Sequence, residues 1–222
     1  MILAIDTSSS FTSIAVVDGY EVCAFAEHDD PRRHAEIISP MLRAVLTDVR
    51  GREFTSIACG IGPGPYTGLR VGIATARALG LAWGIPVVGL CSLDAVATQY
   101  VAEQAASAPF RVAVDARRSE VYWAAYDQHG HRQEGPLVGR LEDVPDDGLV
   151  WVGPVGVHPD ARWIARRVDR LLSDGVAIRA VDIDLEIHGA DGTSTSRALD
   201  GVELLPPSPL YLRRPDAQEP KK

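Results

Sequence analysis

Glycine and proline make up seven of the thirteen residues in GIGPGPYTGLRVG, residues 60–72. A glycine-rich turn ahead of a helix often cradles phosphate groups, because its backbone N–H groups approach the ligand closely. Residues 68–70 read Gly-Leu-Arg, whereas a nucleotide-binding phosphate loop ends in Gly-Lys-Ser or Gly-Lys-Thr. Pro63 and Pro65 also lack the N–H donors that such a cradle uses. The stretch therefore favours a tight entry into a helix, and direct phosphate binding is the weaker alternative.

Two aspartates are a second candidate for phosphate or metal chemistry, because each closes a short apolar run. The runs are Leu-Ala-Ile-Asp at 3–6 and Val-Ala-Val-Asp at 112–115, offset by 109 residues. At the same offset the strand-like segment 13–18 lies over 122–127 without a gap. Two segments in one register predict an internal duplication, with an aspartate at the start of a hairpin in each half.

A hairpin that binds phosphate through backbone amides needs small residues after its aspartate. Asp6 is followed by Thr-Ser-Ser-Ser, which meets this need in part, whereas Asp115 is followed by Ala-Arg-Arg. Arginines can bind an anion, but a structural ion-pair network of Asp115, Arg117 and Glu120 is the favoured alternative. The candidate residues of these two degenerate phosphate hairpins are Asp6, Ser8, Ser9, Asp115 and Arg117.

The elements that would position these residues follow from the hydrophobic pattern. In the first half, the pattern predicts three strands, then a helix, a strand, a helix, a strand and a helix. The predicted ranges are 1–5, 13–19, 21–26, 31–49, 55–60, 68–83, 86–90 and 92–106. Asp30 would cap the first helix, and Pro40 would kink or restart it. This order fits a mixed sheet with helices packed on it.

The second half is predicted less completely. Its pattern indicates a strand at 150–153 and an amphipathic helix at 160–173, while the polar, Gly-Thr-Ser-rich stretch 182–200 has no clear assignment. We expect a first domain over residues 1–108, a second and duplicated domain over 109–215, and a tail over 216–222.

A stripe of small residues follows the glycine-rich turn at successive i+4 positions. Its members are Gly68, Gly72, Ala76, Gly80 and Gly84. Glycine inside a helix costs about 1 kcal/mol relative to alanine, so repeated glycines indicate that other atoms come close to this face. The two alternatives are packing on the protein's own sheet and contact with a helix of another chain.

Composition argues against several classes of function. The chain has 222 residues and a formal net charge of −8, which is unfavourable for a stand-alone nucleic-acid binder. It shows neither a signal peptide nor an apolar run that could span a membrane, which predicts a cytoplasmic protein without membrane contact. Its three cysteines are far apart, and its histidines form no metal-binding motif.

Arg162, Arg166 and Arg170 lie at i+4 spacing, where a solvated helix face is favoured over a phosphate contact.

Four segments together resemble the bacterial TsaB (YeaZ) family, which takes part in making N6-threonylcarbamoyladenosine (t6A) beside the tRNA anticodon. They are MILAIDTSS at the start, GPGPYTGLRVG at 62–72, DARRSEVY at 115–122 and PLYLRRPDA at 209–217. The resemblance implies an actin-like α/β fold of the sugar kinase–Hsp70–actin superfamily, with duplicated βββαβαβα halves in two subdomains. Residues 182–200 depart from the family pattern, which has a helix there.

The resemblance also implies that the chain lacks the chemistry of its catalytic paralogue, TsaD. That relative carries an H-x-x-x-H metal-binding pair after the equivalent strand, and Ser92 and Val96 stand in those places here. Serine and valine cannot supply imidazole ligands. We therefore expect no catalytic residue, no metal ligand and no bound cofactor in this chain, with ATP and a divalent metal belonging to the partner.

By the same resemblance, the chain is a non-catalytic scaffold or activator of threonylcarbamoyl transfer to N6 of the tRNA adenosine. Its expected partners are a TsaD-like paralogue, a TsaE-like ATPase in the same complex and, indirectly, tRNA; the isolated chain is expected to form a homodimer. The family places the interface on the helices at 34–49 and 68–83. The candidate interface residues are His34, Glu36, Ile38, Met41, Leu42, Val45, Gly68, Arg70, Gly72, Ala76 and Gly80. The alternatives are an independent ATP-binding, kinase-like enzyme and a metallopeptidase, the latter disfavoured by the missing histidine pair.

Overall fold

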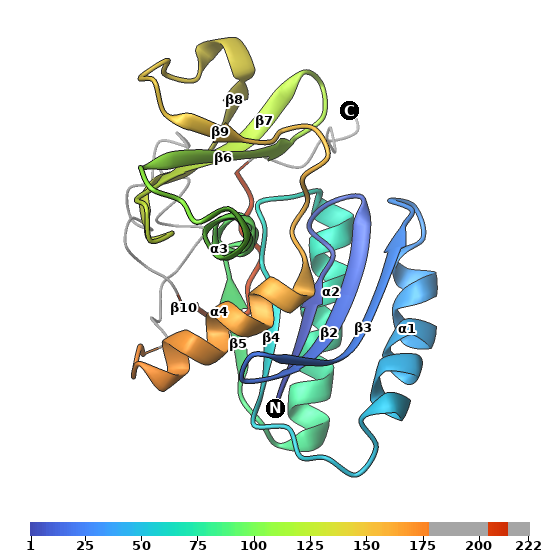
Figure 1. The fold of residues 1–222 in the computed structure, drawn as a ribbon. Coiled ribbons are helices and arrows are strands. Elements are labelled where there is room, and N and C mark those ends of the chain that lie inside the picture. The colour runs from blue at the N-terminus through green and yellow to red at the C-terminus, as the bar shows by residue number, and fades with distance from the viewer. Residues whose placement is uncertain (178–203, 213–222) are drawn as a thin grey trace, which may run out of the picture.

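Two β-sheets form the frame of the molecule (Figure 1). The computed structural model describes residues 1–177 and 204–212, so the features predicted at 182–200 and 216–222 lie outside the described residues. The strands are β1 (Ile2–Asp6), β2 (Phe11–Asp18), β3 (Glu21–Asp29), β4 (Ser56–Gly60), β5 (Val87–Leu90), β6 (Phe110–Asp115), β7 (Glu120–Tyr126), β8 (Arg132–Arg140), β9 (Val150–Val152) and β10 (Leu204–Leu205). The helices are α1 (His34–Asp48), α2 (Tyr66–Trp83), α3 (Ser92–Gln104), the short 3₁₀ helix η1 (Leu141–Asp143) and α4 (Ala161–Ser173).

The first sheet has the strand order β10-β5-β4-β1-β2-β3. Strands β1, β2 and β3 form an antiparallel meander, and β4 and β5 run parallel to β1 on its other side. Every residue of β1 and β4 is buried, as expected of central strands with both faces covered. The element order predicted for the first half is therefore confirmed.

The second sheet repeats the first in its strand relations. Its order is β8-β7-β6-β9, in which β6 pairs antiparallel with β7 and parallel with β9, just as β1 pairs with β2 and β4. This repetition supports the predicted duplication. However, Asp6 lies opposite Ser13, whereas Asp115 lies opposite Val121. The second hairpin is thus one residue shorter, and the ungapped overlay of 13–18 on 122–127 is wrong by one residue.

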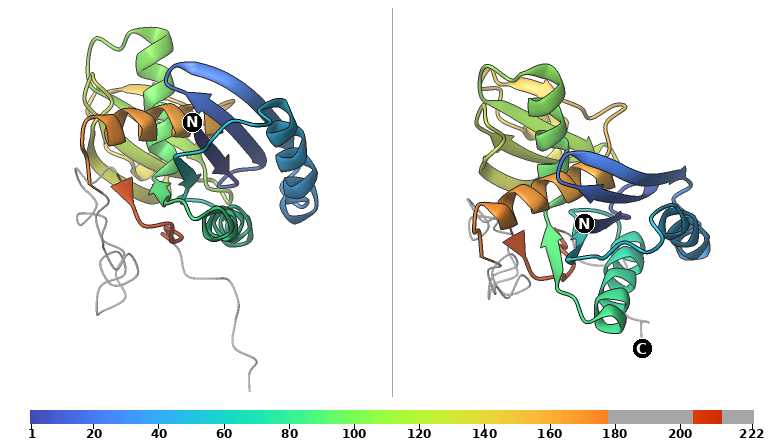
Figure 2. Two further views of the ribbon diagram at one scale, coloured as in Figure 1. Left: turned by 90° about the horizontal axis from the view of Figure 1, so that it is seen from below. Right: turned by 60° about the horizontal axis from the view of Figure 1, so that its bottom comes forward.

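Helices cover both faces of the first sheet (Figures 1 and 2). Helices α1 and α2 lie on one face, where Leu42 and Ile73 belong to the same buried cluster as Val16 of β2. Helix α4 lies on the other face, where Ile164 shares a cluster with Val17. Successive residues of a strand point to opposite faces, so the apolar run in β2 serves both helical layers.

Two elements from the second half belong to the first sheet. Strand β10 pairs with β5, and α4 packs on β1 and β2 with its backbone N–H of Ala161 donating to Ser13 Oγ at 2.9 Å. The physical reason is that Ile2, Ala4 and Ala15 would otherwise expose an apolar face to water. The division between residues 108 and 109 stays a prediction, but these two elements cross it.

Helix α1 begins later than predicted. Asp30 and Pro31 form a turn, in which the Asp30 side chain accepts from the Arg32 backbone N–H, and the helix starts only at His34. The helix continues through Pro40, which lies on its exposed side, so it does not restart there. No helix in the described part of the chain is long and apolar enough to cross a membrane.

Helix α3 joins the two sheets through a buried ion pair in its first turn. The Asp94 carboxylate accepts from Arg132 Nε of β8 at 2.9 Å and from the Tyr126 hydroxyl of β7 at 2.8 Å. Both charged side chains are almost completely buried, and Arg132 also donates to the Gly135 carbonyl. Burial of the hydroxyl beside Asp94 raises the pKa of Tyr126 well above its ordinary value. Removing either charge would break this buried pair, which is strongly destabilising.

We therefore expect Asp94→Ala to lower the free energy of unfolding by about 3–5 kcal/mol, because it breaks the buried ion pair with Arg132. Urea denaturation of the purified chain measures this change. The control is Glu103→Ala, which removes an exposed carboxylate from the same helix and should change stability by less than about 0.5 kcal/mol. Equal stabilities of the two variants would contradict the role given to Asp94.

Candidate functional site

Asp6 lies at the end of β1 with its carboxylate fully inside the protein. One oxygen accepts from the Ser8 backbone N–H at 2.9 Å and from the Ser8 hydroxyl at 2.8 Å, and the other accepts from the Ser92 hydroxyl at 2.9 Å. Burial raises the pKa of Asp6 above its usual value of 3.8, and these hydrogen bonds oppose that shift. The carboxylate that could hold a phosphate-bound metal is thus used by neighbouring side chains.

The glycine-rich stretch closes over this hairpin. A Cβ atom on Gly60 would lie 1.7 Å from Asp6 Oδ2, and one on Gly64 would lie 2.1 Å from the Ser8 carbonyl oxygen. The loop then enters α2 directly after Pro65. The glycines are therefore needed for close packing between the loop and the turn, and the predicted tight helix entry is confirmed.

Ser92 and Val96 are both buried. These are the residues that stand where the resembling catalytic paralogue has its metal-binding histidines. The Ser92 hydroxyl donates to Asp6 and accepts from the Gly62 backbone N–H at 3.2 Å, while Val96 belongs to the apolar core. Within residues 1–177 and 204–212, no group of three or more His, Cys, Asp or Glu side chains could hold a metal ion. The donor set at this position therefore does not fit a divalent metal.

The small-residue stripe on α2 faces the protein's own sheet. The Thr7 hydroxyl donates to the Gly68 carbonyl at 2.7 Å and accepts from the Gly72 N–H at 3.1 Å, so it bridges two consecutive turns of the helix. A Cβ atom on Gly72 would lie 2.3 Å from this hydroxyl, and one on Gly80 would lie 2.2 Å from Val87. Gly84 ends the helix in a left-handed conformation. Of the two alternatives for the stripe, the structure therefore shows packing on the protein's own sheet for its first four members, Gly68, Gly72, Ala76 and Gly80, whereas Gly84 is exposed.

The other predicted interface residues divide into buried and accessible sets. His34, Ile38, Leu42 and Val45 are buried, and Ala76 is buried with the stripe; Glu36 and Arg70 are exposed, and Met41 is half-buried. His34 accepts or donates at Thr12 Oγ1, and burial is the main cause that lowers its pKa. The buried residues hold α1 and α2 on the sheet, so they are unavailable to a partner in this conformation.

The turn of the second hairpin is exposed to solvent, whereas the turn after Asp6 is buried, and its backbone conformation differs. Asp115 is exposed and accepts from the Arg117 backbone N–H at 2.8 Å. Arg117, Arg118 and Ser119 all have positive φ angles, of 61°, 57° and 62°, which non-glycine residues adopt at some cost. Among the described residues no ion pair joins Asp115 to Arg117, so that part of the predicted ion-pair network is wrong. Ser9 accepts from the Phe11 N–H and so belongs to the first turn.

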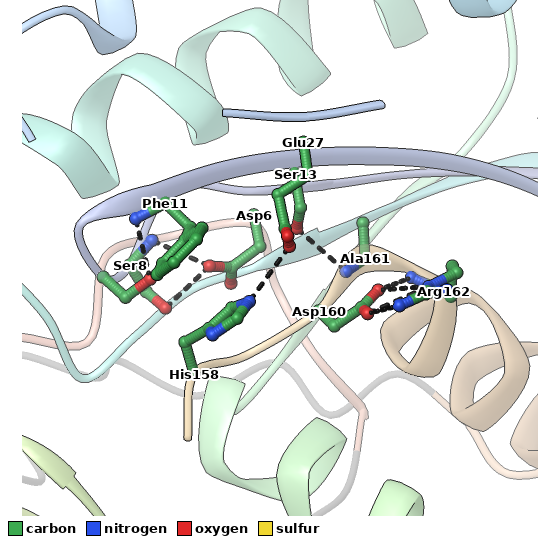
Figure 3. Close-up of polar contacts among 10 residues, drawn as sticks. Asp6, Ser8, Phe11, Ser13, Glu27, His158, Asp160, Ala161 and Arg162 are labelled. Atoms are coloured by element: carbon green, nitrogen blue, oxygen red, sulfur yellow. Dashed lines mark hydrogen bonds and ion pairs between the residues drawn. The ribbon is translucent and has the colours of Figure 1, made fainter. Parts of the chain in front are cut away.

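The segment before α4 approaches the first hairpin, which the sequence alone did not indicate (Figure 3). The His158 ring stacks on Phe11 with centroids 3.7 Å apart, and its Nε2 lies 3.0 Å from Glu27 Oε1. Asp160 caps α4 and pairs with Arg162. A cavity of about 300 Å³ lies beside this segment, against α3 and β3. The helix predicted at 160–173 is confirmed as α4, but nothing in the hydrophobic pattern indicated the contacts of His158.

Comparison with known proteins gives consistent results. A family model described as TsaD, tRNA N6-adenosine threonylcarbamoyltransferase, matches residues 29–144. Uncharacterized proteins of Mycobacterium bovis and Mycobacterium leprae are each 35% identical over 98% of this chain, which spans 93% of the first and 56% of the second. The Escherichia coli tRNA threonylcarbamoyladenosine biosynthesis protein TsaB is 37% identical over 145 residues, which are 61% of this chain and 62% of that protein.

A solved structure supports the fold. An uncharacterized Pseudomonas aeruginosa protein with similarity to peptidase YEAZ has a TM-score of 0.67 at 27% identity, with 78% of this chain and 92% of that one covered. Together with the repeated strand order, this likeness confirms the predicted actin-like, duplicated α/β fold.

The raised pKa of Asp6 predicts a pH-dependent stability. The folded state binds this proton more tightly than the unfolded state, so the contribution is present below pH 3.8 and is lost as the pH rises through the native pKa. The unfolding free energy of the wild type minus that of Asp6→Asn should therefore fall with rising pH. Urea denaturation across a pH series measures it, and Asp18→Asn controls for loss of an exposed carboxylate. A difference that rises with pH would contradict the burial argument.

Packing of the stripe on Thr7 predicts that Gly72→Ala destabilises the chain by about 1–3 kcal/mol, although alanine is the better helix former. Thermal and urea unfolding measure the loss. Gly139→Ala is the matched control, since no atom lies within 4 Å of a Cβ atom there. If Gly72→Ala were as stable as the control variant, the close contact would be refuted. Because Gly72 packs inside the protein, replacing it by a larger residue changes the stability of the fold and does not test docking to a partner.

Proposed function

The chain belongs to the TsaB/YeaZ family, and from that membership we propose that it is a subunit of the machinery that makes t6A in tRNA. Its proposed role is non-catalytic: it supports a TsaD-like paralogue that transfers the threonylcarbamoyl group to the adenosine N6. A TsaE-like ATPase completes the proposed complex, and ATP and a divalent metal are assigned to these partners. Its proposed location is the cytoplasm.

The observation that carries the non-catalytic role is the contact between Asp6 and Ser92. A catalytic paralogue needs an aspartate and imidazole ligands open toward the cleft, and here the aspartate is buried against a serine hydroxyl. Gly60 and Gly64 bring the loop so close to the turn that even a Cβ atom at either position would clash with it. These contacts support a scaffold role, in which Asp6 and Ser92 stabilise the fold at the positions that hold catalytic groups in the paralogue.

We propose the outward faces of α1 and α2 as the docking surface, in place of the buried stripe. Leu81 is 88% exposed, and the exposed Ala78 and Ala74 lie on the same side of α2 about one and two turns before it, with the exposed Arg77 beside them. An exposed apolar patch rimmed by polar side chains is a common feature of docking sites. Arg70, at the start of the helix, stacks on Tyr66 and donates to the Tyr211 hydroxyl at 3.1 Å, which holds the end of this face in place. In the isolated chain the same face would support a homodimer.

Reconstitution tests the role directly. Purified chain, TsaD-like paralogue, TsaE-like ATPase, the threonylcarbamoyl donor and unmodified tRNA are combined, and t6A is measured by mass spectrometry after digestion. Omitting this chain should lower product formation at least about tenfold, and this chain with donor and tRNA alone should form none. Product formation by the chain alone, turnover of ATP by the chain alone, or no loss on omission would overturn the proposal.

The docking surface predicts that Leu81→Asp weakens association with the paralogue at least about tenfold, because it places a charge in an apolar contact. Calorimetric titration measures the affinity, and the unfolding midpoint should be unchanged since the side chain is exposed. Val155→Asp, at a residue that is 91% exposed on the loop before α4, is the matched control. Undiminished binding by Leu81→Asp would place the interface elsewhere.

A further inference from the structure

A groove of about 760 Å³ lies between α3, α4 and the turn that joins β2 to β3. It is separate from the Asp6 site and from the proposed docking face. Its walls carry the arginines Arg166, Arg167 and Arg170, the aspartates Asp169 and Asp174, and Tyr20. Arg167 is buried and donates to the Gly130 carbonyl, so Arg166 and Arg170 are the guanidinium groups that the groove presents beside the two carboxylates.

The arginines of α4 do not form the uniformly solvated face that the i+4 spacing predicted. Arg162 is committed to Asp160 and stacks over Phe25, and Arg167 is buried. Arg166 and Arg170 line the groove. Among the described residues, no ion pair neutralises either of these two side chains.

The Arg166 side chain is held in position by two contacts, which do not use all of its N–H donors. Its Nη2 donates to the Tyr20 carbonyl at 3.0 Å, and its guanidinium lies 4.6 Å from the centre of the Trp163 ring. Its Nε is shielded from solvent and has no hydrogen-bond partner in the described part of the chain. Because this Nε is closed to solvent, a ligand in the groove would instead be bound by the terminal Nη groups of the guanidinium, which carry four N–H donors.

We propose that this groove binds a nucleotide-sized phosphate ester. Arg166 and Arg170 would bind the phosphate, since a guanidinium pairs with two phosphate oxygens at once. The carboxylates of Asp169 and Asp174 would accept from sugar hydroxyls, as carboxylates do in nucleotide sites. Tyr20, which is 88% exposed at the rim, offers a ring on which a base can stack.

Size and charge favour a small ligand over a polyanion. The groove volume lies within the range of ordinary small-molecule sites, about 300–1,000 Å³. The two carboxylates in the lining and the acidic net charge of the chain would repel a long phosphate backbone, whose binding depends on many cationic contacts.

Titration of the full chain with AMP and with inorganic phosphate, followed by calorimetry and NMR, tests the proposal. Both probes should bind one site, with shifts at Tyr20 and Arg166. Arg166→Gln and Arg170→Gln should each weaken both probes about tenfold, the usual effect of losing a charged hydrogen bond. Tyr20→Ala should weaken AMP binding and leave phosphate binding and the unfolding midpoint unchanged, because this side chain is exposed.

The matched control is Arg43→Gln, which removes an exposed arginine from α1 and should leave both affinities unchanged. Absence of AMP binding at millimolar concentration, or equal affinities in wild type, Arg166→Gln and Arg170→Gln, would overturn the site. A short RNA is titrated in parallel. Binding that grows with RNA length and is lost at raised salt, without AMP competition, would overturn the small-ligand assignment.

Discussion

Burial of the turn after β1 is the constraint on which the rest of the structure depends. Asp6 is removed from water, so its carboxylate must find hydrogen bonds inside the protein, which Ser8 and Ser92 supply. Thr7, the next residue, bridges Gly68 and Gly72 of α2. Each close approach requires a residue without a side chain. The glycine-rich loop, the position of α2 and the start of α3 are therefore determined together by one short turn.

The sequence was sufficient where local pattern decides the structure. Apolar runs ending in Asp6 and Asp115 located the first meander and the first two strands of the second, but not β8, and the helical period located α2. The sequence was insufficient where contacts between distant segments decide the structure. The i+4 spacing of Gly68 and Gly72 shows that one helix face carries small residues. The atom that covers this face belongs to Thr7, some 60 positions away, which the spacing does not reveal. The return of α4 and β10 to the first sheet, and the place of His158, are of the same kind.

The molecule combines an enzyme-like architecture with side chains that serve packing. Ser92 bonds to Asp6, Val96 fills the core, and the second hairpin carries exposed arginines where small residues would be needed for a phosphate. The regions left free to interact lie on the outside, on α2 around Leu81 and in the groove beside Arg166. These are the places where the proposed interactions would occur, and neither includes Asp6 or Asp115.

Helix α3 also limits how the chain can move. Ser92 is bonded to the first sheet and Asp94 to the second, and only two positions along one helical turn separate them. Helix α4 adds another tie between the halves through Ala161 and Ser13. A rotation of one sheet against the other about the start of α3 would therefore break at least one of these buried hydrogen bonds. The first turn of this helix holds the two sheets in one relative orientation.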